Sequence, residues 1–176
     1  AIARALAAKP QVIICDEVTS GLDASVGASI VMLLREIQAT SGTALIFITH
    51  DLAILRHLAH RIAVMYLGDI VETRATATLD HTPYHPYTEA LLSSSHSIDP
   101  GSTTRRVRLT GALPTRTTKL KGCPFASRCP HKQGAICDTD APPVQSTTAN
   151  HTIACHIPID DLVRHAPVWT FTETLP

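Results

Sequence analysis

The chain has 176 residues, and its 15 Lys and Arg balance its 15 Asp and Glu, so the formal net charge is zero. A balanced charge gives no indication of a nucleic-acid partner or of binding to an acidic membrane surface. An aromatic content of 4% also disfavours recognition of bases by stacking. No apolar run reaches the about 18 residues of a membrane-spanning helix, and the length allows one ordinary domain with an appendage.

The first predicted strand leads into two acidic residues. Its apolar run, Val12 to Cys15, is typical of a buried parallel strand, and Asp16 and Glu17 follow directly. Ligands of open α/β sheets bind at the carboxyl ends of the strands. Two carboxylates there are costly unless a metal ion, a water molecule or a proton occupies them. The alternative is a strand that simply runs into an acidic loop.

A helix and a second strand are predicted next. Asp23 is a good N-cap for a helix over residues 24–40, in which apolar side chains recur at helical spacing. Ser41 and Gly42 end this helix, and residues 43–48 form a second apolar run of strand length. The order strand, helix, strand predicts a βαβ unit with parallel strands and a right-handed crossover.

The second strand also ends in polar groups, Thr49, His50 and Asp51. Since the two strands are expected to be parallel, Asp16, Glu17 and His50 should share one edge of the sheet. Two carboxylates and an imidazole in one place suit Mg²⁺ binding and the activation of a water molecule.

Residues 1–75 resemble the nucleotide-binding subunit of an ATP-binding-cassette (ABC) transporter, because several motifs of that family occur in order. These are a helix like the one after the LSGGQ signature at residues 1–6, a Walker B strand at Val12–Glu17, a D-loop at Ser20, Gly21, Leu22 and Asp23, and an H-loop at Thr49–Asp51. The resemblance implies an α/β fold. The expected fold is a partial P-loop NTPase of the ABC ATPase type, with a parallel sheet and helices, followed by a loop-rich, cysteine-containing C-terminal extension.

The resemblance also implies roles for the matching residues. Asp16 would hold Mg²⁺, Glu17 would be the general base that polarises the attacking water, and His50 would contact the γ-phosphate of ATP. The D-loop would contact a partner nucleotide domain. Val18 stands where many relatives carry proline, which removes no catalytic group. Phosphoryl transfer needs mainly positioning and charge stabilisation, and a site at strand ends can supply both.

Three motifs of the family are not found in these 176 residues. One is the Walker A loop, G-x-x-x-x-G-K-S/T, which offers main-chain N–H groups and a lysine to the phosphates. The other two are the LSGGQ signature and the glutamine loop. We therefore interpret the chain as the C-terminal part of a longer subunit, and we expect it not to hydrolyse ATP by itself.

Regular elements are expected to continue as far as about residue 95. The sequence predicts a short helix capped by Asp51, a hairpin that turns at Leu67 and Gly68, and a second short helix, over residues 52–59, 61–73 and 87–95. After residue 97, proline, threonine, arginine and cysteine dominate and apolar periodicity fades. We expect a loop-rich appendage that needs a cross-link or a bound metal to stabilise its fold.

The segment His85-Pro86-Tyr87-Thr88, followed by Ala90-Leu91-Leu92, carries a second resemblance. Taken alone, this segment predicts a proline-rich turn before a surface helix. It also resembles the C-terminal extension of oligopeptide and dipeptide importers, a group that includes nickel and glutathione uptake systems. This resemblance divides the chain into the C-terminal part of a nucleotide-binding domain (1–75), a linking helical segment (76–96) and the extension (97–176).

Four cysteines fall in the extension, Cys123, Cys129, Cys137 and Cys155, whereas Cys15 is expected as a buried core residue. Disulfides would suit a secreted protein better than an ATPase in the reducing cytosol. Zinc usually takes closer pairs, although His131, His151 and His156 could complete a zinc site. Four thiolates also suit a [4Fe–4S] cluster, which some members of the importer group bind in this region. These alternatives, including free thiols, stay open.

Other polar residues receive no role. Of the ten histidines, only His50 has a position that demands chemistry, and His165 is assigned nothing. The basic run Arg105–Arg108 is interpreted as a solvated linker, with a weaker alternative as a contact to a membrane partner.

The resemblance therefore implies the ATP-hydrolysing subunit of an ABC importer for peptides. Such a subunit dimerises with itself or a paralogue, docks on two membrane permease subunits at the cytoplasmic face of the inner or plasma membrane, and serves a substrate-binding protein indirectly. No nucleic-acid partner is expected. The rival functions are a non-transport ABC ATPase and a truncated metal-binding regulatory module without ATPase activity.

Overall fold

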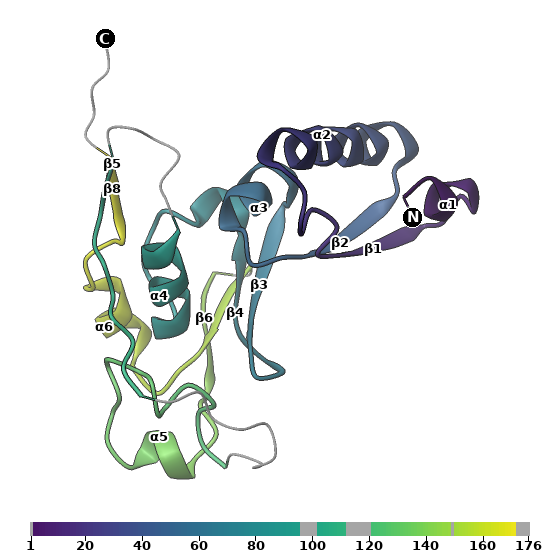
Figure 1. The fold of residues 1–176 in the computed structure, drawn as a ribbon. Coiled ribbons are helices and arrows are strands. Elements are labelled where there is room, and N and C mark those ends of the chain that lie inside the picture. Colours follow the sequence, from purple (N-terminus) through teal and green to yellow (C-terminus); the bar gives the residue numbers. More distant parts are fainter. Residues whose placement is uncertain (1, 96–101, 112–120, 149, 172–176) are drawn as a thin grey trace. The chain divides into compact units, whose positions relative to one another are not determined.

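The computed structural model describes residues 2–95, 102–111, 121–148 and 150–171 (Figure 1). The chain divides into two compact units, an N-terminal unit of residues 1–59 and a C-terminal unit of residues 60–176. The boundaries predicted at 75/76 and 96/97 concern family segments and stay predictions. Across the described ranges, no helix is both long and apolar enough to pass through a bilayer.

The N-terminal unit has the predicted strand, helix, strand order. Its elements are α1 (Ile2–Ala7), β1 (Val12–Asp16), α2 (Ala24–Ser41), β2 (Ala44–Ile48) and α3 (Leu52–Leu58). β1 and β2 pair in parallel, with Val12 opposite Ala44 and Asp16 opposite Ile48. This pairing confirms the expected parallel arrangement and brings the carboxyl ends of both strands to one edge.

The helix α2 begins and ends where its sequence signals it. Asp23 Oδ1 accepts a hydrogen bond from the main-chain N–H of Val26 at 2.9 Å, which satisfies one free donor of the first turn. Gly42, with φ of 67°, donates its N–H to the carbonyl of Gln38. Both predicted ends are confirmed, and the left-handed end is easy only for a glycine.

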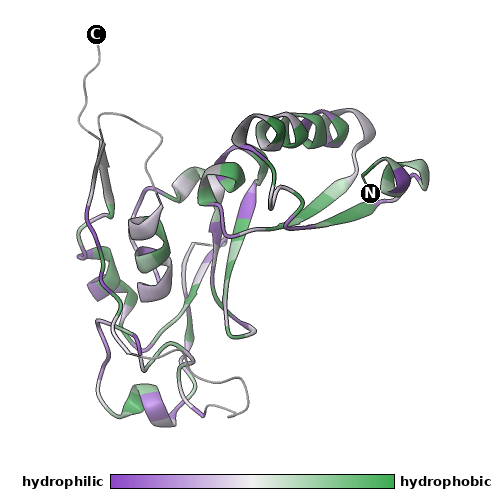
Figure 2. Cartoon of the chain, in the orientation of Figure 1, coloured by the Kyte–Doolittle hydropathy of each residue, from purple (hydrophilic) through white to green (hydrophobic). Residues whose placement is uncertain are grey.

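The β1–β2 sheet has one covered and one exposed face. Cys15 packs with Val31, Leu34 and Leu58 in a buried cluster, which confirms its interpretation as a core residue. The opposite face is apolar yet about half exposed or more, and it consists of Val12, Ile14, Ile46 and Ile48. Figure 2 shows β1 and β2 mostly in the green of hydrophobic residues. Side chains alternate between the two faces of a strand. The expected burial of β1 is therefore correct for one face only within the described residues.

The C-terminal unit contains a four-stranded antiparallel sheet in the order β3-β4-β7-β6, and a small sheet of β5 and β8. Its elements are β3 (Arg61–Tyr66), β4 (Asp69–Ala75), η1 (Thr76–Thr78), α4 (Pro86–Ser94), β5 (Ser102–Thr104), α5 (Ile136–Thr139), β6 (Val144–Thr148), β7 (His151–Ala154), α6 (Ile159–Val163) and β8 (Trp169–Phe171).

The hairpin of β3 and β4 confirms the predicted turn, whereas β6 and β7 correct the expectation of a loop-rich appendage. Leu67 and Gly68 have φ of 51° and 98°, and a two-residue type I′ turn requires positive φ at both positions. Ile153 of β7 pairs with Glu72 of β4, so part of the expected loop-rich appendage completes the sheet of the hairpin. Apolar alternation is weak in β6 and β7, because most of their residues are polar.

The predicted short helix after His85 is confirmed as α4, but it is not a surface helix. Most of its residues are buried. Tyr87 contacts Tyr66 and Phe125, with ring centroids 4.7 and 5.3 Å apart. The proline-rich turn therefore leads into the core of the C-terminal unit, and aromatic packing explains why this segment is apolar.

A buried ionic group, which we call the Glu72 cluster, consists of Glu72, Arg74 and His151. Glu72 Oε1 accepts hydrogen bonds from Arg74 Nη1 at 3.0 Å and pairs with His151 Nε2 at 3.1 Å. Its Oε2 accepts the main-chain N–H of His85 at 2.7 Å. Burial alone would raise the pKa of Glu72, but the hydrogen bonds and the Arg74 charge lower it overall. The cluster thus joins β4, β7 and the start of α4.

Candidate functional site

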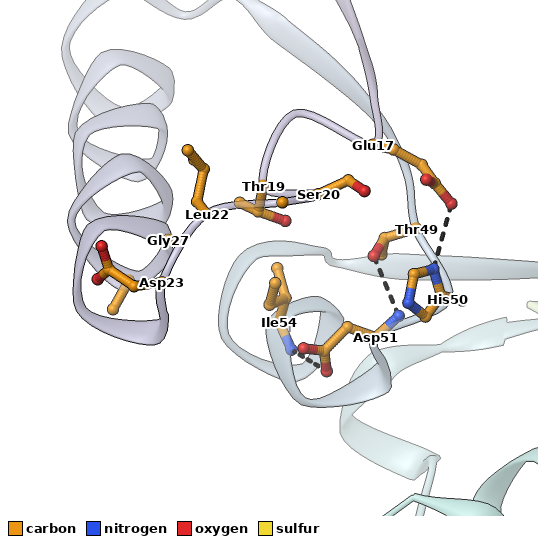
Figure 3. A pocket seen from close by; sticks show the side chains of 12 residues that line it. Glu17, Thr19, Ser20, Leu22, Asp23, Gly27, Thr49, His50, Asp51 and Ile54 are labelled. Carbon is orange, nitrogen blue, oxygen red and sulfur yellow. Dashed lines mark hydrogen bonds and ion pairs between the residues drawn. The ribbon is translucent and has the colours of Figure 1, made fainter.

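A hollow of about 360 Å³ lies in the N-terminal unit beyond the carboxyl ends of β1 and β2. Figure 3 shows the side chains around it. The lining comes from the turn after β1, the start of α2 and the β2–α3 connection, and consists of Glu17, Thr19, Ser20, Gly21, Leu22, Asp23, Gly27, Ala28, Thr49, His50, Asp51 and Ile54.

Glu17 and His50 face each other at this hollow, as Figure 3 shows. His50 Nδ1 lies 3.1 Å from Glu17 Oε1, and the two side chains are 82% and 50% exposed. Glu17 has φ of 45°, which is uncommon for a residue with a side chain, and its N–H donates to the carbonyl of Ile48 at 2.9 Å. The unusual backbone is thereby fixed across the strand ends, and Glu17 and His50, both expected at this edge of the sheet, lie in contact.

The four D-loop residues also line the hollow. The N–H of Ser20 donates to the carbonyl of Glu17 at 2.9 Å, and Gly21 has φ of 75°. Asp23 carries the helix cap, so hydrogen bonds from Ser25 and Val26 lower its pKa. Asp23 is therefore held at the start of α2, while Ser20 to Leu22 stay exposed.

Asp16 does not line the same hollow as Glu17. It borders a second hollow of the N-terminal unit, together with Ile2, Ala3, Leu6, Val18 and Leu33. Neighbouring residues of a strand point to opposite faces, and the positive φ of Glu17 directs the chain onward into the turn. The structure thus brings together Glu17, His50 and the D-loop, and it leaves Asp16 on another surface. The Mg²⁺ role of Asp16 stays a prediction.

The four cysteines of the extension are free thiols, of which Cys137 and Cys155 are buried and Cys123 and Cys129 partly buried. The thiolates of Cys123, Cys137 and Cys155 are close enough to Cys129 for their negative charge to raise its pKa, and those of Cys123 and Cys137 act in the same way on Cys155. Burial contributes more than these charges, and it raises the pKa of Cys129 to about 12 and that of Cys155 to about 11. Four buried or half-buried thiols in one place are therefore costly to ionise unless a cation joins them.

Main-chain N–H groups point at these sulfur atoms. Hydrogen bonds from Phe125 lower the pKa of Cys123, and those from His131 and Ile157 do so for Cys129 and Cys155. The N–H of Gln133 donates to Cys137 Sγ at 3.4 Å. Such donors stabilise sulfur that carries negative charge, as metal-bound thiolates do.

The chain also packs tightly beside the first of these cysteines. A Cβ on Gly122 would lie 2.3 Å from the carbonyl oxygen of Cys137. The N–H of Cys123 donates to that same carbonyl at 2.8 Å. Only glycine allows this approach, so the backbone itself holds Cys123 beside Cys137.

The three histidines considered for a zinc site have other partners. His151 belongs to the Glu72 cluster, His156 Nε2 lies 3.0 Å from the carbonyl of Asp140, and His131 Nε2 lies 3.0 Å from Glu89 Oε2. The expectation that they complete a zinc site with the cysteines is not supported by these contacts.

Sequence reasoning missed a second polar cluster in the C-terminal unit. Arg105, expected in a solvated linker, donates through Nη2 to Glu89 Oε1 and through the same nitrogen to the carbonyl of Ala166. His165, to which no role was assigned, lies with its ring centroid 4.5 Å from that of His131. The one sequence signal for this cluster was an acid, Glu89, amid the apolar residues of α4.

In comparison with known proteins, the matching family model and the similar proteins agree with one another. Residues 71–137 match the family described as oligopeptide/dipeptide transporter, C-terminal region. A protein of Sinorhizobium fredii named as a peptide ABC transporter ATP-binding protein is 46% identical over 156 residues, which cover 89% of this chain and 44% of the relative. A protein of Bacillus subtilis named as an oligopeptide transport ATP-binding protein is 42% identical over 158 residues, covering 89% of this chain and 48% of the relative. The chain thus spans a little under half of each relative.

Proposed function

We propose that this chain, which belongs to the family of oligopeptide/dipeptide ABC transporter ATP-binding proteins, contributes part of an ATPase site that powers the import of peptides. The observation that carries this proposal is the pair of Glu17 and His50 at the carboxyl ends of two parallel strands, beside an open hollow. A carboxylate so placed can accept a proton from a water molecule that attacks a phosphate.

In this proposal each residue of the hollow has a separate task. Glu17 is the general base, and His50 orients its carboxylate through the 3.1 Å contact and reaches the γ-phosphate of ATP. Asp16 is proposed to bind Mg²⁺, although it borders another hollow here. The exposed residues Ser20 to Leu22 are proposed to contact a second ATPase subunit.

The phosphate-binding loop and the signature motif are proposed to lie in other residues of the full protein. Neither motif occurs in these 176 residues, and the relatives are about twice as long as the matched part. This part alone is then expected to lack ATPase activity. Its proposed partners are a second ATPase subunit, two membrane permeases at the cytoplasmic face of the membrane and, indirectly, a substrate-binding protein.

The four cysteines of the extension are proposed to hold a [4Fe–4S] cluster with a structural role. The shared location of the thiols, their burial and the N–H groups that point at them fit thiolate ligands. A bound cluster would supply folding free energy to a region with a small apolar core. Zinc bound by the same thiols is the competing outcome, and metal analysis of the purified protein distinguishes the two.

The test of the ATPase role is Glu17→Gln in the full-length protein. It should keep ATP binding and lower the turnover rate by about 10²-fold or more, because only the proton acceptor is removed. Glu36→Gln, on the exposed side of α2, is the matched control and should turn over ATP normally. Unchanged turnover in Glu17→Gln would remove Glu17 from this role. A native protein that binds no ATP would favour the metal-binding regulatory module.

A further inference from the structure

One carboxylate and two imidazoles converge in the C-terminal unit. They are Glu89 of α4, His131 of the cysteine-bearing segment and His165, which follows α6, and one ligand atom of each lies within 4.8 Å of the others. His131 Nε2 is 3.0 Å from Glu89 Oε2. Since these residues come from three separate segments, the tertiary fold and not local sequence spacing brings them together.

The environment of Glu89 leaves one carboxylate oxygen directed at the imidazoles. Glu89 is 2% exposed, so its charge needs a positive partner. Arg105 occupies Oε1 and is itself anchored, because its guanidinium donates to the carbonyl of Ala166 and its main-chain N–H donates to the carbonyl of Val168, both at 2.9 Å. Carboxylates that bind metals are commonly held in this way by a second hydrogen bond.

We propose that Glu89, His131 and His165 bind a divalent first-row transition metal ion, for which Zn²⁺ is the natural probe. One carboxylate and two imidazoles suit such ions. Bonds of about 2.0–2.2 Å place tetrahedral ligand atoms roughly 3.3 Å apart, close to the 3.0 Å between Nε2 and Oε2. The half-buried rings of both histidines leave an entry from solvent, and three protein ligands leave one position open.

The simpler explanation is an ion pair of Glu89 with Arg105, to which His131 adds a hydrogen bond. That explanation assigns no role to His165, whose ring nevertheless lies against His131. His165 therefore separates the two explanations. It is a metal ligand in the first and a neighbour without function in the second.

A metal here would join α4, the cysteine-bearing segment and the end of α6. It would also act near the thiols, because His131 follows Cys129 by only two residues in the chain. A metal that holds His131 in place would steady the turn that presents Cys129. The proposed site is independent of the ATPase proposal, since none of its residues lies in the N-terminal unit.

The experiment is metal titration of the full-length protein after removal of metal by a chelator, with Co²⁺ and Zn²⁺ as probes. Co²⁺ held by thiolates gives strong sulfur-to-metal absorption, whereas Co²⁺ held by imidazole and carboxylate gives only weak visible bands. His165→Ala should bind one equivalent fewer, or bind it at least about tenfold more weakly. The Co²⁺ absorption that this variant loses should be the weak visible bands and not the strong sulfur-to-metal absorption. His57→Ala, at an exposed histidine of α3, is the matched control and should bind as the unchanged protein does.

A second variant tests whether misfolding could explain the loss of metal binding. His131→Ala should lose the same equivalent, with an unchanged circular dichroism spectrum. Glu89→Gln is less suitable, because Glu89 is buried beside Arg105. Equal binding of both metals by the unchanged protein, His165→Ala and His131→Ala would overturn the proposal. So would a loss confined to the sulfur-to-metal absorption.

Discussion

The two units contain the same chemical pair in different surroundings. Glu17–His50, Glu72–His151 and Glu89–His131 each join a carboxylate oxygen to an imidazole nitrogen at 3.0–3.1 Å. The Glu17 side chain of the N-terminal unit is 50% exposed, whereas those of Glu72 and Glu89 in the C-terminal unit are 0% and 3% exposed. Distance alone therefore does not distinguish the three pairs, and access to solvent does.

The buried pairs should contribute to stability and the exposed pair should not. Removing one partner of a buried ion pair leaves the other charge without compensation, at a cost of about 3–5 kcal/mol. Exposed pairs contribute about 0–1 kcal/mol, because water and salt screen them. An exposed pair beside an open hollow is thus available for chemistry without loss of the fold.

The largest expected effect on stability is that of Glu72→Ala. It should lower the free energy of unfolding by about 3–5 kcal/mol, because Arg74 loses its buried counter-charge. Glu17→Ala is the matched control and should cost less than about 1 kcal/mol. Urea denaturation of the full-length protein measures both. Equal losses would mean that burial does not distinguish the two pairs.

The next effect concerns His85, which lies beside the Glu72 cluster. Burial lowers its pKa to about 4 from an ordinary value of 6.5. Its stabilising contribution is complete above pH 6.5 and is lost as the pH falls from 6.5 to about 4, because the unfolded chain then takes up a proton that the folded chain excludes. The expected loss is about 3 kcal/mol over that window.

His85→Asn should flatten this dependence. An Asn side chain can still accept the N–H of Tyr87, as His85 Nδ1 does at 3.1 Å. Urea denaturation of the unchanged protein and the variant at pH 7 and pH 4.5 gives the comparison, with the exposed His57→Asn as control. The same pH slope in all three proteins would contradict a buried neutral His85.

The smallest effect is expected at the cap of α2. Asp23→Ala should lower the melting temperature slightly, because Val26 loses the acceptor of its N–H. Asp23→Asn keeps an acceptor and serves as control. Thermal denaturation should rank the unchanged protein and Asp23→Asn above Asp23→Ala. No difference between the two variants would mean that the cap bond contributes nothing.

The features that the sequence predicts correctly are local ones. The cap at Asp23, the end at Gly42 and the turn at Leu67 and Gly68 each depend on residues next to one another. Parallel pairing of β1 and β2 followed from two apolar runs joined by a helix. The expected parallel pairing also predicted that Glu17 and His50 lie at one edge of the sheet.

The features that the sequence misses depend on long-range contacts. β7 pairs with β4 from about 80 residues away in the chain, and β6 pairs with β7. The polar sequences of both strands carry little period-2 signal. Glu89, Arg105 and His131 meet only through the tertiary fold. Asp16 and Glu17 were expected at one edge of the sheet, and the strand pattern does not indicate that they border different hollows there.

The most direct test of the central claim, that Glu17 and His50 act as one catalytic unit, is a double-mutant cycle on ATP turnover by the full-length protein. Glu17→Gln and His50→Ala are measured singly and together. If His50 acts by positioning Glu17, the double variant should be within about threefold of the slower single variant, because the unit is already lost. Fully multiplicative losses would mean that the two residues act independently and would contradict the account.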